Sequence, residues 1–300
     1  MKRSDKAIVT MAIGDRYLRP WKIHCEANWR AYADRYGFDL ICIEKPFDTS
    51  RRALQRNPSW QKCLILGQPI LRDYERILWI DSDVLINVSL APNICENVPI
   101  EKVGAVNDKS LPSPELHKTA LLRLRQARGW KGWTEDTKHP GRAYYEFMGL
   151  SPDFDQVVNM GILLLSPAHH HKLLQKIYYD YEDRGGREFH MEMPAGSWEL
   201  LKAGVVHWLD RRFNAVWTYD EVINYPFLVN LDHGPRNYDR IKRKLIGMGL
   251  AWTSLLDVRR ACLNASFWRS FFLHFGGRED TLSLMSSVDL KAETWRNCKL

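Results

Sequence analysis

Apolar segments of two different periods alternate through the first 108 residues, and this alternation restricts the fold more than any other feature of the sequence. Short apolar runs typical of buried strands occupy residues 6–13, 38–44, 76–80 and 102–108. Large apolar side chains recur at helical spacing between Tyr17 and Tyr36, and again between Trp60 and Leu71. Strands and helices in alternation predict an α/β fold with a mostly parallel sheet flanked by helices.

The third predicted strand runs directly into two aspartates, Asp81 and Asp83, before apolar residues resume at Val84. Ligands of such sheets collect at the carboxyl ends of the strands, where this pair lies. Residues two apart on a strand point to the same side, so both carboxylates could face one Mg²⁺ or Mn²⁺ ion, which would offset the cost of burying them. The alternative is a polar Asp-Ser-Asp turn without a metal. The apolar runs on both sides favour the metal site.

A histidine near the end of the chain is the second candidate ligand. His274 follows an apolar run and precedes Gly276 and Gly277. A histidine in apolar surroundings is more often a core residue than a ligand, but the backbone of two glycines can approach a diphosphate closely. If His274 joins Asp81 and Asp83, the mixed oxygen and nitrogen set favours Mn²⁺ over Mg²⁺.

The charge and the cysteines narrow the class of protein. The formal net charge is +7, but Lys and Arg are scattered and no nucleic-acid-binding motif is present, so we expect no nucleic-acid partner. None of the six cysteines forms a CxxC pair, which favours reduced thiols. No apolar stretch approaches the roughly 18 residues of a membrane span, and the first apolar run lacks a cleavage site. The expectation is a cytoplasmic protein.

Three segments together carry a resemblance to a known family. They are the DSD-containing segment 60–86, the apolar strand VVNMGILLLSP at 157–167, and LHFGG at 273–277. These segments resemble the signature segments of GT-A-fold glycosyltransferases, in particular family 8, the glycogenin and lipopolysaccharide galactosyltransferase group, and the related family 34. Their order and approximate spacing agree over residues 7–277, nearly the whole chain. The resemblance implies a GT-A-type, Rossmann-like sheet with an insertion lobe and a C-terminal lobe.

The resemblance also implies a set of ligands and residues. It implies that Asp81, Asp83 and His274 hold Mn²⁺, with Mg²⁺ as the alternative, and that the donor is a nucleotide-diphosphate sugar, usually a UDP-sugar. The remaining donor-site residues implied by motif position are Thr10, Ala12 and Tyr17 around the nucleoside, Lys62 and Asn159 near the sugar, and Ser82, Gly276, Gly277 and Arg278.

Two positions depart from the family 8 pattern. Where that family has a lysine that contacts the pyrophosphate, this chain has Asp280, and Arg278 is the nearby cation. We also find no clean Asp-Gln pair for the reaction centre, and take Glu192 as the substitute catalytic residue beside Asp81 and Asp83. The departures favour a neighbouring family over family 8 itself.

These features predict a metal-dependent, retaining glycosyltransferase that moves a hexose from a UDP-sugar to a saccharide or other cell-envelope acceptor. Residues 1–300 would form one domain, with a nucleotide-sugar-binding half (1–108), an insertion (109–155), and an acceptor-side half with a C-terminal lobe (156–300). The alternatives are a non-catalytic sugar-nucleotide or glycan-binding protein, and a nucleotidyltransferase, which the lack of a Gly-rich basic loop after the first strand disfavours. A lipid-linked acceptor would suit a peripheral membrane contact through the basic run at 240–244.

Overall fold

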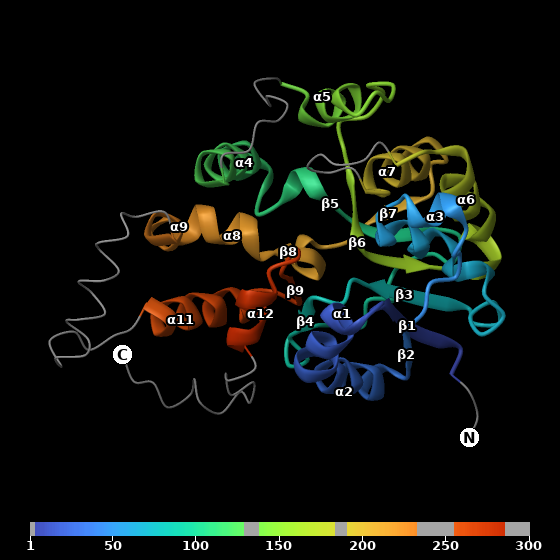
Figure 1. Cartoon of the computed structure of the whole chain (residues 1–300), viewed down its shortest axis with the longest axis horizontal. Coiled ribbons are helices and arrows are strands. Elements are labelled where there is room, and N and C mark those ends of the chain that lie inside the picture. The colour runs from blue at the N-terminus through green and yellow to red at the C-terminus, as the bar shows by residue number, and fades with distance from the viewer. Residues whose placement is uncertain (1–3, 129–137, 184–190, 233–254, 286–300) are drawn as a thin grey trace, which may run out of the picture.

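A large sheet lies at the centre of the molecule. The structure is a computed structural model, and it describes residues 4–128, 138–183, 191–232 and 255–285. The six strands of the large sheet follow the order β2-β1-β3-β6-β5-β7 (Figure 1). Strand β6 is antiparallel to β3 and β5, and the other neighbours are parallel. The strands are β1 (Lys6–Met11), β2 (Asp39–Ile43), β3 (Arg76–Ile80), β5 (Val103–Asn107), β6 (Val158–Leu165) and β7 (Val206–Trp208). The predicted α/β fold with a mostly parallel sheet is confirmed.

The central strands are largely apolar, apart from Arg76 in β3 and Asn159 in β6, because the sheet is covered on both faces. Every residue of β3 and β6 is buried. In β1, Ile8 packs into one hydrophobic core while its neighbours Ala7 and Val9 pack into the other. Strands buried on both faces show continuous apolar sequence without alternation, which is the pattern seen here.

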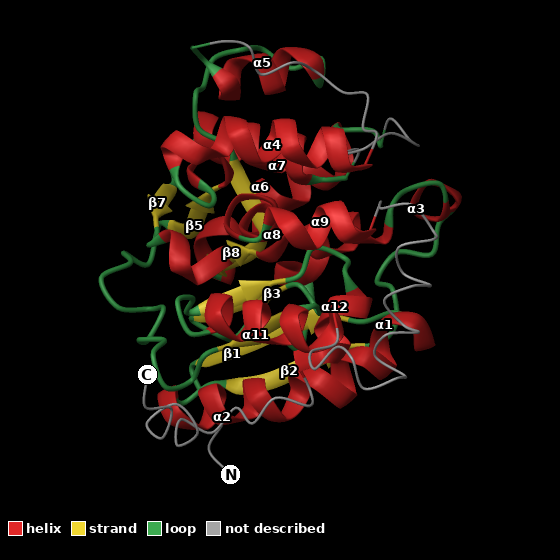
Figure 2. Ribbon diagram, turned by 90° about the vertical axis from the view of Figure 1, so that its left-hand side faces the viewer, coloured by secondary structure: helices red, strands yellow, loops and turns green. Residues whose placement is uncertain are grey.

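Helices supply this cover on both sides (Figure 2). One core joins the sheet to η2, α6 and α7, and the other joins it to α2 and to the C-terminal helices. The described α-helices are α1 (Asp15–Pro20), α2 (Glu26–Tyr36), α3 (Arg51–Leu54), α4 (Pro114–Arg128), α5 (Pro140–Phe147), α6 (Pro167–Asp180), α7 (Met193–Lys202), α8 (Trp217–Asn224), α9 (Pro226–Asp232), α11 (Leu255–Phe267) and α12 (Glu279–Met285). Shorter turns of other types are the π-helix η1 (Trp21–Cys25) and the 3₁₀ helices η2 (Pro58–Gly67), η3 (Asp108–Ser110) and η4 (Arg211–Asn214).

The helix predicted between Tyr17 and Tyr36 forms as one path through α1, η1 and α2. It ends at Gly37, whose φ of 69° places it in the left-handed region that glycine adopts readily. The stripe from Trp60 onward also forms a helix, but of the tighter 3₁₀ type, and it ends at Gly67, so Ile70 and Leu71 lie in the turn that follows.

A second, three-stranded sheet lies beside the large one. It contains β4 (Val84–Ile86), β8 (Ala215–Val216) and β9 (Phe272–His274) in the order β4-β9-β8. Figure 1 places it between the large sheet and helices α8, α9 and α11. The chain therefore leaves the large sheet after β3 and enters the small one at β4, with Asp81, Ser82 and Asp83 in between.

Two further observations concern the expected cellular setting. No helix within the described residues is long and apolar enough to cross a bilayer. The five cysteines that the structure describes are free thiols, as the sequence predicted: Cys25, Cys42, Cys63, Cys95 and Cys262. The basic run at 240–244 lies outside the described residues.

Candidate active site

The aspartate pair lies in the connection between the two sheets. Strand β3 ends at Ile80, and Ser82 and Asp83 form a turn before β4 begins at Val84. The Asp81 N–H still donates to the carbonyl of Gly161 in β6, at 2.9 Å. The expectation that both aspartates lie on one continuous strand is therefore wrong, because the chain changes sheets here. The two carboxylates consequently have different partners.

Asp81 belongs to a buried charge cluster with Lys62 and Glu192. Lys62 Nζ donates to Asp81 Oδ1 at 3.0 Å and to the Met160 carbonyl at 3.1 Å, and lies 2.8 Å from Glu192 Oε1. These three acceptors match the three donors of an ammonium group. The indole N–H of Trp79 donates to the same oxygen of Asp81, at 2.8 Å. Lys62 thus holds the two acids together and presents no free N–H to a donor sugar.

Glu192 has one carboxylate oxygen without a partner. Its side chain is 3% exposed, and Oε2 forms no hydrogen bond with any described residue. An unpaired buried carboxylate oxygen costs free energy, which a hydrogen bond from a ligand would offset. The structure brings Glu192 into the same cluster as Asp81, which the sequence did not show.

Asp83 faces the other predicted ligand. Its Oδ1 lies 3.3 Å from Nε2 of His274, and its Oδ2 accepts from the N–H of Gly277, 194 residues further along the chain. Its backbone carbonyl accepts from Phe275 at 3.0 Å. One aspartate therefore anchors the whole segment that follows β9.

A chain of hydrogen bonds extends from His274 into the core of the molecule. Nδ1 of His274 lies 3.0 Å from Oδ1 of Asn214, whose Nδ2 donates to Oδ1 of Asn159 at 2.8 Å. The same Asn159 oxygen accepts from the N–H of Gly161, and Asn159 Nδ2 donates to Oδ1 of Asp108; both bonds measure 3.0 Å. Asn159 is thus tied to protein groups at both ends of its amide.

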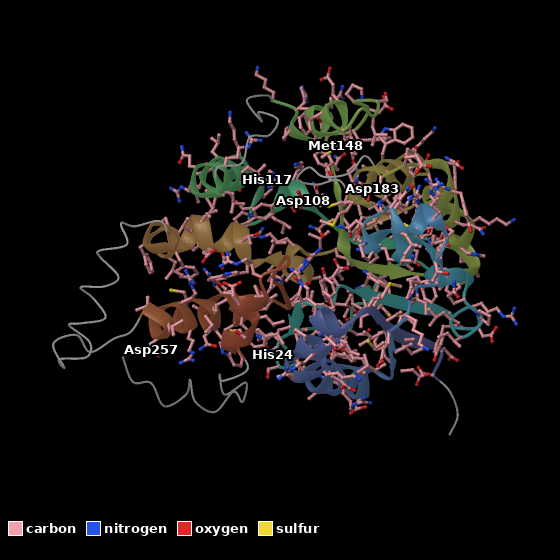
Figure 3. The ribbon with its side chains drawn as sticks, in the orientation of Figure 1. His24, Asp108, His117, Met148, Asp183 and Asp257 are labelled. Atoms are coloured by element: carbon pink, nitrogen blue, oxygen red, sulfur yellow. The ribbon has the colours of Figure 1, made fainter. Side chains whose placement is uncertain are left out.

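Sequence reasoning missed Asp108 and Asn214. Asp108 follows β5 at the carboxyl end of that strand (Figure 3), the same kind of position that singled out Asp81. This signal was available in the sequence. Asn214 ends the short helix η4 and carried no comparable signal, because its role depends on contacts with β6 and β9.

The charges shift the protonation of these groups. Burial raises the pKa of Asp81, and the attraction of Lys62 opposes this only in part. Burial also acts against ionisation of Asp83, but the charge and hydrogen bond of His274 outweigh it and hold the pKa of Asp83 below its usual value. Burial alone would lower the pKa of His274, yet the charge of Asp83 raises it. Lys62 follows the same rule, since Asp81 and Glu192 outweigh burial and raise its pKa.

The residues expected around the nucleoside lie along and after β1. Thr10 is fully buried, and its hydroxyl has no hydrogen-bond partner within the described part of the chain. Ala12 is also buried, and Tyr17 on α1 keeps 44% of its surface exposed beside the guanidinium of Arg16. Ser82 contributes its carbonyl, which faces the thiol of Cys25 at 3.5 Å.

The glycines and the arginine after β9 have partners in the protein. Gly276 and Gly277 are exposed, and their φ angles of 60° and 78° are values that residues other than glycine rarely adopt. Arg278 donates to both oxygens of Asp280 and lies 3.5 Å from Glu221 Oε2. The cation expected to compensate for Asp280 is therefore paired with Asp280 itself.

The donor chemistry of this site suits a hard divalent cation. Two carboxylates and an imidazole are ligands that Mn²⁺ accepts, and a neighbouring group already faces the other ring nitrogen of His274. Across the described ranges, no three His, Cys, Asp or Glu side chains are gathered closely enough to hold a metal. Asp83 and His274 are in place as a pair, whereas Oδ1 of Asp81 is occupied by Lys62.

Comparisons with known proteins bear on the fold. No protein-family model matches the chain, and no curated protein matches its sequence. The solved structure of the WbbM bifunctional glycosyltransferase matches 99% of this chain at 11% identity with a TM-score of 0.52, and this chain spans 52% of that protein. A glycosyltransferase involved in glycosylation of the PBCV-1 major capsid matches 94% of this chain and 100% of its own at 12% identity (TM-score 0.47). The galactosyltransferase LgtC, in complex with donor and acceptor sugar analogs, matches 97% and 99% at 15% identity (TM-score 0.47). At these identities the similarity to WbbM shows the fold, and the GT-A-type fold that the sequence resemblance implied is confirmed.

Proposed function

We propose that this protein is a metal-dependent glycosyltransferase that moves a hexose from a UDP-sugar to a saccharide or other cell-envelope acceptor. One observation carries the proposal: Asp83 after β3 meets His274 at the end of β9, with Asp81 beside them, at the carboxyl edge where α/β folds bind ligands. The GT-A-type fold supports sugar transfer as the reaction class. Mn²⁺, with Mg²⁺ as the alternative, is part of the same proposal.

The chemistry of the reaction matches the charges in the site. Breaking the anomeric C–O bond places negative charge on the leaving diphosphate, and a divalent cation, when bound, supplies positive charge at that point. In this proposal Asp83 and His274 hold the cation, and Asp81 completes the set with the oxygen that Lys62 does not occupy. Lys62 fixes Asp81 and Glu192 in position.

Glu192 has a role of its own in the proposal. Its unpaired oxygen Oε2 accepts a hydrogen bond from a hydroxyl of the donor sugar, which removes the cost of burying that atom unpaired. Thr10 offers a second such atom toward the nucleoside, and Tyr17 offers an exposed ring for the base. Retention of anomeric configuration, with the acceptor attacking from the leaving-group side, is part of the proposal and rests on the family resemblance. So is a lipid-linked acceptor.

One observation favours a second candidate, a sugar-nucleotide-binding protein without turnover. Asp280 replaces the lysine expected to contact the pyrophosphate, and it pairs with Arg278. A site with fewer cations stabilises the leaving diphosphate less, whereas binding of the nucleoside is unaffected. Turnover distinguishes the two candidates.

The experiment measures nucleoside diphosphate released from a panel of UDP-, GDP- and ADP-sugars with Mn²⁺, Mg²⁺ or EDTA. We expect release from a UDP-sugar that stops with EDTA and in Asp83→Asn. The matched control is Asp73→Asn, because Asp73 is an exposed aspartate outside the site. UDP binding without release supports the binding protein. Release of pyrophosphate instead, from a nucleoside triphosphate and a sugar phosphate, supports a nucleotidyltransferase.

A further inference from the structure

We infer that Asn159 and Asn214 are positioning residues that keep a proton on Nδ1 of His274, so that Nε2 is the nitrogen that meets the metal ion. This inference rests on the metal site of the proposed function. It concerns how these two asparagines orient His274, and it assigns neither of them as a ligand of the cation.

At the inner end of this chain of hydrogen bonds, two groups have a fixed role, one as a donor and one as an acceptor. The backbone N–H of Gly161 is a donor, and the carboxylate of Asp108 is an acceptor when ionised. Asn159 lies 3.0 Å from each of them. Its amide must therefore direct Oδ1 toward Gly161 and Nδ2 toward Asp108, since the opposite orientation would place donor against donor and acceptor against acceptor.

The orientation of Asn159 then determines that of Asn214. Because Oδ1 of Asn159 is an acceptor, the atom of Asn214 that faces it at 2.8 Å is the donor Nδ2. Oδ1 of Asn214 is left to face Nδ1 of His274 at 3.0 Å. An amide oxygen can only accept, so Nδ1 carries the proton.

Because Nδ1 carries the proton, Nε2 is the ring nitrogen of His274 whose lone pair can bind the cation. Nε2 of His274 lies 3.3 Å from Oδ1 of Asp83. If Nε2 were unprotonated and no cation were present, its lone pair would face a carboxylate oxygen. A proton or a metal ion must lie between these atoms. The hydrogen bonds that run from Asp108 through Asn159 and Asn214 to His274, here called the relay, hold the proton on Nδ1. A metal ion that binds His274 would therefore replace the proton on Nε2.

Burial of the relay keeps the direction of its hydrogen bonds fixed. Asn214 is fully buried, and Asn159 and His274 are 8% and 9% exposed, so water does not compete for their amide and ring atoms. In known metal sites, removing a group that orients a ligating histidine lowers metal affinity by about 10- to 100-fold. We expect a loss of that size here when the Asn214 oxygen is removed.

The first test uses the metal-free full-length protein. In ¹⁵N-histidine-labelled wild type, Nδ1 of His274 should carry a proton protected from exchange, with the resonance identified by its loss in His274→Gln. Asn214→Leu should lose that protection. An unprotonated Nδ1 in the wild type at neutral pH would overturn the inference, whether or not the protein binds a metal.

The second test measures Mn²⁺ affinity by electron paramagnetic resonance. Asn214→Leu should weaken binding about 10- to 100-fold. Asn214→Asp keeps an acceptor for the Nδ1 proton but loses the N–H that Asn159 accepts, so it should weaken binding less than Asn214→Leu does. The matched control is Asn87→Leu, because Asn87 is equally buried and its side-chain amide donates to Phe267 outside the relay.

The two proposals fail in different ways. If the wild type binds no Mn²⁺, the proposed metal site fails, and the histidine spectrum alone decides the inference. If the wild type binds Mn²⁺ but Asn214→Leu binds it equally well, the relay is overturned and the metal site stands. Equal weakening in Asn214→Leu and Asn214→Asp would also overturn the relay, since it would indicate a purely structural effect.

Discussion

Gly161 and His274 are packed so closely that no side chain fits between them. A Cβ added to Gly161 would lie 2.5 Å from Cε1 and 2.9 Å from Nδ1 of the imidazole. Real Cβ atoms do not approach other heavy atoms so closely, and the ring is held by Asn214 on one side and Asp83 on the other. The glycine in the sequence VVNMG is therefore explained by the histidine that packs on it.

We predict that Gly161→Ala displaces His274 and weakens Mn²⁺ binding by at least 10-fold, in line with the loss of an oriented histidine ligand. The control is Gly196→Ala, where the added methyl group would meet the flexible end of Met160, which can move. Calorimetric titration with Mn²⁺ measures both variants. Unchanged affinity in Gly161→Ala would contradict the placement of His274.

Asp83→Asn should abolish sugar-nucleotide turnover while the protein stays folded. The neutral amide loses the charge that faces His274 but can still accept from the N–H of Gly277. We expect a loss of at least about 100-fold in kcat/KM, or about 2.7 kcal/mol. Thermal unfolding should show that the fold is retained. An active variant that no longer responds to EDTA would rule out Asp83 as a metal ligand.

Lys62→Met should destabilise the fold, because it leaves Asp81 and Glu192 buried without their common partner. Removing one member of a buried charge cluster typically costs about 3–5 kcal/mol. Urea unfolding measures the loss. Adding Glu192→Leu to Lys62→Met should recover part of the stability, and a double variant no more stable than the single one would show that the two side chains are not coupled.

The pH dependence of stability should contain a contribution from Glu199 in α7. Burial acts against its charge, but hydrogen bonds from Lys176 at 2.5 Å and Tyr181 at 2.7 Å outweigh burial and lower the pKa of Glu199. A lowered pKa stabilises the fold above the unfolded value of about 4.3, and this stabilisation is lost as the pH falls through the lower folded pKa.

Glu199→Gln should therefore lower the free energy of unfolding at pH 7 by about 1–3 kcal/mol, and the difference from the wild type should shrink below about pH 4. The control is Glu146→Gln, because Glu146 is exposed on α5. Urea unfolding at several pH values checks both. A Glu199→Gln deficit that stays constant down to acid pH would exclude the ionised carboxylate as its source.

Local sequence was sufficient for much of the fold. Strands β1, β2, β3, β5 and β6 lie where apolar runs predicted them, and in β3 and β6 these runs reflect burial on both faces of the sheet. The end of α2 at Gly37 follows from the left-handed conformation that glycine tolerates. Asp81, Asp83 and His274 were also found as candidates, since a polar residue at the end of a buried strand needs a partner that offsets its burial.

Only the tertiary structure decided how these residues meet. The periodicity of a central strand is the same in parallel and antiparallel pairs, so the sequence could not reveal that β6 runs against its neighbours. It also could not reveal that Asp81 turns to Lys62 while Asp83 turns to His274, because the change from one sheet to the other depends on contacts with β9 far along the chain.

The relay from Asp108 through Asn159 and Asn214 to His274 marks this division most clearly. Each of its side chains is an ordinary polar residue in the sequence, and each is separated from its partners by at least 51 residues. The sequence by itself determined which strands are buried and where acids follow them, because burial and backbone conformation are local preferences. The tertiary structure alone decided the direction of the hydrogen bonds, because that direction depends on donors and acceptors brought together from η3, β6, η4 and β9.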